Sequence, residues 1–219
     1  TAALEKLSKF TYKIGYPNKW RDYSALNVEP GQLVKNYQAY VEFEFEEMIT
    51  SLSKPVDKSK WHMTPQTVNA YYNPVGNEIV FPAAILQPPF FDMNADDAVN
   101  YGGIGAVIGH ELSHGFDDQG AKYDGDGNLR NWWTDSDKAE FEKRSKQLSQ
   151  QYSAFAPFDD ASINGDLTLG ENIGDLGGLT VAFRSYLLSL NGEKSTVMDG
   201  LTGEQRVFVG WSQVWRRKY

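Results

Sequence analysis

The residues that could do chemistry gather first in the segment Gly109–Gly115, which reads Gly-His-Glu-Leu-Ser-His-Gly. It contains the pattern His-Glu-x-x-His, and the run from Gly105 to Ile108 before it suits the buried face of a helix. Side chains four residues apart lie on one helix face, so His110 and His114 can hold one zinc ion at about 2.0–2.1 Å each. Glu111 lies next to that metal. Zinc and a carboxylate together can produce a hydroxide-like nucleophile at neutral pH.

A third ligand is needed, because the motif alone also fits a surface helix whose histidines and glutamate make ordinary capping or salt contacts. The segment Gly170–Asp175 opens a second apolar-patterned helix, on which Glu171 and Asp175 are again four residues apart. Glu171 can complete a His, His, Glu set that leaves one position for water, as a catalytic zinc requires. Asp175 can accept the other ring N–H of a ligand histidine and fix its tautomer. These residues predict one catalytic Zn²⁺ per chain.

Composition narrows the class of protein. The chain has 219 residues, of which 41% are hydrophobic and 14% aromatic, which favours a folded core over disorder. The net charge is −8 and no basic stripe follows any predicted helix, so we expect no nucleic-acid partner. No window approaches the roughly 18 apolar residues of a membrane helix, so we expect no membrane partner.

Cysteine is absent from the sequence, which excludes disulfides, thiol nucleophiles and cysteine-ligated zinc. This fits a reducing compartment, and we expect a cytoplasmic protein. A bacterial cell surface or secreted location is the alternative, because many such proteins also lack cysteine.

The elements that must position the site follow from apolar spacing and stop signals. Residues 1–32 are expected to be irregular connecting structure. Two strands, at 67–73 and 78–81, are predicted to form a hairpin. Helices are predicted at 34–52, 99–116, 134–155, 171–190 and 202–215, the third and the fifth opened by capping boxes. The fold class is therefore α+β, mostly helical, with a small sheet. The helix from residue 171 is expected to bury Leu176, Leu179, Phe183, Tyr186, Leu187 and Leu190.

The loop after the metal motif contains Asp124, Asp126 and Asn128 at alternate positions, as at the start of a calcium loop. Leu129 stands where that loop needs glycine, and Asp135 stands where it needs a bidentate glutamate. A plain turn is the favoured interpretation.

Four blocks carry a resemblance to a known family: residues 68–72, 79–91, 110–120 and 170–178. Their order and spacing resemble the neprilysin family of zinc endopeptidases, most closely its bacterial endopeptidase O members. The resemblance covers the chain from about residue 12. It implies a thermolysin-like zincin catalytic domain at 66–219, truncated at its C-terminal end, after a connecting segment and long helix at 1–65.

The resemblance also implies roles for individual residues. His110, His114 and Glu171 would bind zinc, Glu111 would act as general base and then acid, and Asp175 would support a ligand. Asn69 and Ala70 would lie on the edge strand of the sheet and hydrogen-bond the backbone of a peptide substrate. Taken alone, Asn69 is better explained as a strand residue near a turn.

An apolar pocket for the residue after the cut is a further implication of the resemblance. It would be lined by Ile85, Phe90, Val107 and Trp215, although each of these residues could equally be plain core. The substrate expected from this pocket is an oligopeptide cleaved on the amino side of a large hydrophobic residue.

The sequence departs from the family in length. Members have a helical lid domain before this region and a segment after it whose histidine and arginine stabilise the oxyanion. The only histidine here outside the metal motif is His62, in another context. We therefore expect a fragment whose partner is the missing remainder of the same protein. The alternatives to a zinc endopeptidase are a non-catalytic zinc- and peptide-binding fragment and a metal-free structural domain.

Overall fold

The computed structural model describes residues 2–216, in two compact units. Unit 1 combines residues 1–16 with residues 63–219, and unit 2 is the segment Pro17–His62. The first sixteen residues thus belong with the later part of the chain, and the domain boundary at residue 65 stays a prediction. Unit 1 holds most of the helices and a three-stranded sheet.

The sheet of unit 1 has the order β1-β3-β2, with β1 at Thr11–Gly15, β2 at Tyr71–Asn73 and β3 at Glu78–Pro82. Strand β3 is buried throughout; it pairs in parallel with β1 and antiparallel with β2. The predicted hairpin of β2 and β3 is confirmed, although β2 begins at Tyr71 rather than at residue 67. Strand β2 lies at an edge of the sheet.

The prediction for residues 1–32 was wrong over its first half. Residues Ala2–Ser8 form helix α1, and Thr11–Gly15 form strand β1. The apolar side chains of β1, Tyr12 and Ile14, are exposed, so the strand does not bury an apolar face that a sequence pattern could reveal. Its order comes from pairing with β3, more than sixty residues away.

The metal helix is confirmed and consists of three consecutive parts. Helix α3 (Asp97–Asn100) leads into a π-helical turn, η2 (Tyr101–Gly105), and then into α4 (Ala106–His114). The turn contains two glycines in close contact with other backbone. A Cβ at Gly102 would lie 1.9 Å from the carbonyl oxygen of Val207, and one at Gly103 would lie 2.4 Å from that of Phe90.

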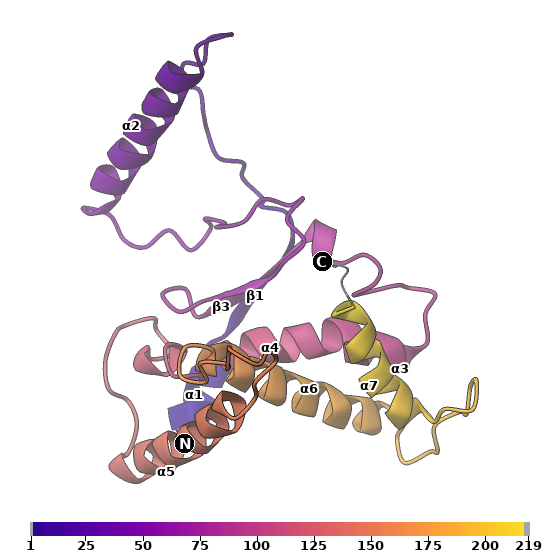
Figure 1. Cartoon of the computed structure of the whole chain (residues 1–219). Helices are drawn as coiled ribbons and strands as arrows, with labels where there is room; N and C mark the ends of the chain where they lie inside the picture. Colours follow the sequence, from indigo (N-terminus) through magenta and orange to yellow (C-terminus); the bar gives the residue numbers. More distant parts are fainter. Residues whose placement is uncertain (1, 217–219) are drawn as a thin grey trace. The chain divides into compact units, whose positions relative to one another are not determined.

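Helix α6 (Leu169–Ser189) packs along α4 (Figure 1). The two backbones meet at glycines, because a Cβ at Gly109 would lie 2.7 Å from the Gly178 carbonyl oxygen, and one at Gly178 would lie 2.5 Å from that of Ala106. The predicted apolar face of α6 was partly wrong. Tyr186 is buried, but Leu176 and Leu187 are exposed. The face of α6 that packs against α4 carries small residues, Gly174 and Gly178, in place of the large apolar side chains expected there.

The remaining elements of unit 1 complete its framework. Before α7 the predicted capping box is complete, because Thr202 accepts from the backbone of Gln205 and Gln205 accepts from the backbone of Thr202. Before α5, Thr134 accepts from the backbone of Asp137 but donates to its carboxylate, so only half of the predicted box is present. The other bounds are η1 at Ala83–Ile85, η3 at Gly120–Lys122, α5 at Asp135–Ser153 and α7 at Gly203–Val214. One apolar core lies between the sheet and α4, and a second joins α3, α6 and α7 around Ala98, Tyr186 and Val207.

Unit 2 contains one long helix, α2 (Leu33–Ser51), as predicted (Figure 1). None of its residues is buried, and most of its apolar side chains, Phe45 and Met48 among them, are exposed. Arg21 pairs with Glu44 and Glu47 on this helix. No helix within residues 2–216 is both long and apolar enough to cross a membrane.

Candidate metal centre

Three side chains predicted as zinc ligands converge in unit 1. His110 and His114 come from α4, and Glu171 comes from the first turn of α6. The carboxylate of Glu171 lies 3.3 Å from Nε2 of His110 and 3.9 Å from Nε2 of His114. One donor atom from each residue lies within 4.8 Å of the others. The close packing of α4 and α6 produces this convergence.

Each histidine is held on its other ring nitrogen by a carboxylate. Nδ1 of His110 lies 2.8 Å from Asp175 Oδ1, and Nδ1 of His114 lies 2.7 Å from Asp117 Oδ2. A ring whose Nδ1 donates to a carboxylate binds a metal through Nε2 once that nitrogen has lost its proton, and Nε2 is the nitrogen that faces Glu171. The predicted contact of Asp175 with a ligand histidine is therefore present.

Asp117 performs the same task for His114, and sequence reasoning missed it. It lies three residues after His114, beyond Gly115, where α4 ends. Each histidine ligand normally has its own orienting partner, and the sequence predicts a partner, Asp175, for only one of the two. An aspartate just past the end of the metal helix was the signal that could have identified the second partner.

The charges around the histidines favour a cation. Burial lowers the pKa of His110, but hydrogen bonds to Asp175 and Glu171 outweigh it and raise that pKa to about 10. For His114, burial lowers the pKa and the hydrogen bond to Asp117 more than compensates, so its pKa is also raised. The hydrogen bond from His110 lowers the pKa of Glu171. The surrounding carboxylates thus stabilise positive charge at the ligand atoms.

The donor set fits zinc. Two imidazole nitrogens and one carboxylate form a common catalytic set, and ligands bonded at about 2.0–2.2 Å lie roughly 3–4 Å apart. The separations of 3.3 and 3.9 Å from Glu171 to the two Nε2 atoms agree with this spacing. Both histidines are partly buried, and the Nδ1 contacts with Asp175 and Asp117 orient their rings.

Glu111 lies beside the ligands on α4 and is 4% exposed. Its Oε2 atom is buried and has no hydrogen-bond partner among the described residues. Burial raises the pKa of Glu111, and the charge of Glu171 acts in the same direction, while the two histidines oppose it. A buried carboxylate oxygen left without a donor is available to accept a proton from a small molecule at the site.

The ligands open into a cavity of about 680 Å³. Glu111 lines this cavity, and so do Asn69 and Ala70, which immediately precede β2 and extend the edge of the sheet. Asn69 is exposed and Ala70 is buried. The metal ligands and the predicted substrate-binding segment therefore share one cavity.

Three of the four residues predicted to form an apolar pocket lie in or against one apolar cluster. Ile85 and Val107 are buried in the same cluster as Ala70, and Phe90 packs against that cluster. Trp215 caps α7 and contacts the ring of Trp211, with 5.3 Å between ring centroids. It is exposed and does not belong to the cluster. The role of these residues in substrate binding stays a prediction.

Comparison with known proteins places this geometry in a family. The model of Peptidase family M13 matches residues 69–219. Human endothelin-converting enzyme 1 is 43% identical over 98% of the chain, and neprilysin-3 of Drosophila melanogaster is 40% identical over 97%. The chain spans only 29% and 28% of the length of these two relatives.

Solved structures agree with the sequence comparison. The crystal structure of the Mycobacterium tuberculosis zinc metalloprotease ZMP1 matches with a TM-score of 0.94 and 61% identity, over 98% of this chain and 34% of that one. PepO from Lactobacillus rhamnosis matches with a TM-score of 0.80 and 35% identity, over 98% and 33%. The fold, the His-His-Glu cluster and these matches agree: the chain belongs to Peptidase family M13.

Proposed function

We propose that this chain is the zinc-binding catalytic region of an endopeptidase that cleaves oligopeptides on the amino side of large hydrophobic residues. The observation that carries the proposal is the shared cavity, where the three metal ligands, the buried carboxylate of Glu111 and the segment before β2 meet. The similarity to the zinc metalloprotease ZMP1 supports the same activity.

His110, His114 and Glu171 would hold the zinc ion, which when bound supplies Lewis-acid chemistry to a carbonyl and lowers the pKa of water. Glu111 accepts one proton from the attacking water as the water oxygen bonds to the scissile carbonyl carbon. Glu111 then delivers this proton to the amide nitrogen as the carbon–nitrogen bond breaks. The products are a carboxylic acid and an amine, so atoms and charge balance.

The substrate is placed by the edge of the sheet. An extended peptide can add beside β2 through main-chain hydrogen bonds, which demand no particular sequence. Asn69 and Ala70 lie at the cavity end of this edge. The apolar cluster of Ile85, Phe90 and Val107 begins next to Ala70, which supports a large hydrophobic residue after the cut. Trp215, outside that cluster, adds the least support.

The partners in this proposal are the peptide and further segments of a longer protein. The relatives are about three times as long as this chain, which leaves room for a lid domain and for a C-terminal segment with oxyanion donors. Loss of one such donor typically reduces turnover by about 10²–10³-fold. The same difference in length favours the second candidate function, a fragment that binds zinc and peptides without cleaving them.

The test combines metal analysis with one substitution. We expect one zinc per purified chain, and cleavage of short peptides that have a bulky apolar residue after the scissile bond. Glu111→Gln should keep the zinc and lower turnover by at least about 10²-fold, because it removes the proton acceptor and none of the ligands. Glu193→Gln, which changes an exposed carboxylate outside the site, is the matched control.

Three results would change the proposal. Unreduced turnover in Glu111→Gln would remove that residue from its role. A chain that binds zinc and peptides but cleaves none would favour the second candidate. Folded chain that takes up no zinc from saturating solution would refute both functions.

A further inference from the structure

A lysine from the N-terminal helix is buried behind the metal centre. Lys6 belongs to α1 and is 1% exposed, although lysine is rarely buried without partners. Its Nζ donates to three backbone carbonyl oxygens, at 2.6 Å for Gly115, 2.8 Å for Gly120 and 2.7 Å for Tyr123. All three ammonium donors are therefore used.

Aromatic rings surround the same ammonium group. Nζ lies 5.8 Å from the ring centroid of Tyr72 and 5.5 Å from those of Phe116 and Trp132. These separations lie within the range at which a cation is attracted to a ring face. Three carbonyls and three rings together make a site built for one cation, and that cation is part of the chain.

The three carbonyls enclose the segment that holds Asp117. Gly115 ends α4 directly after His114, and Gly120 begins η3, which ends before Tyr123. Asp117 Oδ1 accepts from the backbone N–H of Gln119 at 2.8 Å and of Gly120 at 2.6 Å, which leaves Oδ2 for the ring of His114. Lys6 thus binds both ends of the turn that orients a metal ligand.

This turn is tightly packed. A Cβ at Gly120 would lie 1.8 Å from the carbonyl oxygen of His114, and a Cβ at Gly115 would lie 2.4 Å from the ring of Phe10. A shift at either end of the turn therefore has to move its neighbours, including Asp117. The hydrogen bonds of Lys6 to Gly115, Gly120 and Tyr123 hold the two ends of this turn in place.

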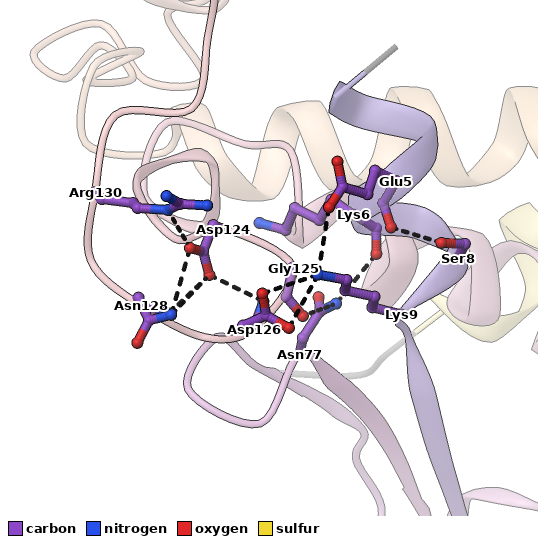
Figure 2. Close-up of polar contacts among 10 residues, drawn as sticks. All are labelled: Glu5, Lys6, Ser8, Lys9, Asn77, Asp124, Gly125, Asp126, Asn128 and Arg130. Carbon is purple, nitrogen blue, oxygen red and sulfur yellow. Dashed lines mark hydrogen bonds and ion pairs between the residues drawn. The ribbon is translucent and has the colours of Figure 1, made fainter.

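Helix α1 is itself held in place by contacts that do not involve the metal centre. Lys9 pairs with Asp126 at 2.8 Å, and Asn77 donates to the carbonyl oxygens of Lys6 and Gly125 (Figure 2). Asn77 is fully buried and accepts from the hydroxyl of Tyr72. The backbone of Lys6 is anchored independently of its side chain, so a change of the side chain can be tested alone.

We propose that Lys6 is a positioning residue for the metal centre: its ammonium fixes the turn from Gly115 to Tyr123, so that Asp117 holds the His114 imidazole in its metal-binding orientation. The inference rests on the zinc site of the proposed function and extends it to a residue more than one hundred positions away.

The test measures the zinc affinity of the metal-free protein by competition with a chromophoric chelator. Lys6→Met keeps the apolar length of the side chain and removes the charge and all three donors. We expect about a tenfold weaker zinc affinity, at the lower end of the roughly 10–100-fold typical for residues that support a ligand. Lys9→Met, directly after the same helix and with a more exposed ammonium paired to Glu5 and Asp126, should leave the affinity unchanged.

A second readout separates positioning from general stability. In the Co²⁺-substituted protein, Lys6→Met should shift the visible absorption bands, which report ligand geometry, while Lys9→Met should reproduce the original spectrum. In a double-mutant cycle, Lys6→Met should cost no further zinc affinity once Asp117→Asn is present, because Lys6 acts through Asp117. Equal losses in both backgrounds would show that Lys6 supports only the fold, and would overturn the proposal.

Unchanged zinc affinity in Lys6→Met would also overturn it. If Lys6→Met does not fold, Lys6→Arg provides the same test, because a planar guanidinium keeps the charge but cannot direct three N–H groups at these three carbonyls. It should fold, bind zinc more weakly, and show the same dependence on Asp117. Failure of the original protein to bind zinc would refute the proposed function, whereas normal binding with no effect at Lys6 refutes only this inference.

Discussion

Helix α6 of unit 1 and helix α2 of unit 2 were predicted from the same kind of pattern, yet they differ in what they bury. They have 21 and 19 residues, and both repeat apolar side chains every three or four positions. Five residues of α6 are buried, and none of α2 is. Apolar spacing therefore predicts that a helix forms, but it does not predict whether its apolar face is covered.

Glycine marks the difference between these two helices. Gly174 and Gly178 of α6 lie against α4, where a Cβ at Gly174 would lie 2.8 Å from the ring of His110. Helix α2 contains no glycine. Since glycine lowers the stability of an isolated helix, its presence inside α6 indicates a close backbone contact. Bulky apolar residues give no such information about a partner.

The largest combined effect, on stability and on zinc binding together, is expected where α4 and α6 touch. Gly178→Ala would place a Cβ 2.5 Å from both the Ala106 carbonyl oxygen and the His110 nitrogen, and backbone cannot move aside as a flexible side chain can. We expect unfolding to become easier by about 3 kcal/mol, together with weaker zinc binding. Denaturant unfolding and metal titration measure the two effects.

The matched control for this substitution is Gly105→Ala, where the nearest atom would lie 3.4 Å from the new Cβ, an ordinary contact distance. It should be neutral or stabilising by up to about 1 kcal/mol, because alanine favours helix. Equal effects at the two glycines would contradict the role assigned to the α4–α6 contact.

A smaller effect on folding stability, one that depends on pH, is expected from the buried carboxylate of Asp124 in unit 1. Burial raises the pKa of Asp124, but hydrogen bonds from the backbone of Asn128 and Asp126 and from Arg130 outweigh it and lower that pKa to about 2. The ordinary value is 3.8, so the folded protein favours the carboxylate. Asp124 therefore contributes stability above about pH 4, and this contribution is lost as the pH falls toward 2.

Unfolding of the metal-free protein measures this contribution across pH. The stability difference between the original protein and Asp124→Asn should be largest above pH 4 and should shrink toward pH 2. In unit 2, Glu44→Gln disrupts a partly exposed pair with Arg21 and should change stability by less than about 1 kcal/mol. An Asp124 effect that does not vary with pH would contradict the assignment.

The smallest effect is expected on α2. Phe45 is 54% exposed, so Phe45→Ala should change the free energy of unfolding by less than about 0.5 kcal/mol. Phe81→Ala, in the buried strand β3, removes a ring that is 3% exposed and should cost about 3–5 kcal/mol. A large loss of stability at Phe45 would show that the face of α2 is covered in the protein as purified.

The metal ligands could be predicted from the sequence because helix geometry is local. His110 with His114, and Glu171 with Asp175, are each four residues apart, so one helical turn fixes their relation. The convergence of the two pairs depends on α4 packing against α6, which no spacing shows; it was inferred from the need for a third ligand and from the resemblance to a family. The main capped helices and the hairpin could also be predicted from short-range signals.

The parts that escaped prediction depend on contacts distant in sequence. Strand β1 is ordered by pairing with β3, and α1 is held through Lys6 by carbonyls more than one hundred residues away. A lysine at position 6 carries no local sign that it is buried. The exposure of Leu176 on α6 depends likewise on which neighbour faces each side of the helix.

The π-helical turn η2 determines how α4 is rotated about its own axis, and so which way its histidines point. Each residue of an α-helix adds about 100° of rotation, and the five residues Tyr101–Gly105 stand between α3, which packs against α7, and the first residue of α4. Deleting one of them while α3 stays docked would turn His110 and His114 by about a quarter of a circle, away from Glu171. The length of this turn therefore determines where the two imidazoles point, while its glycines determine how closely it packs.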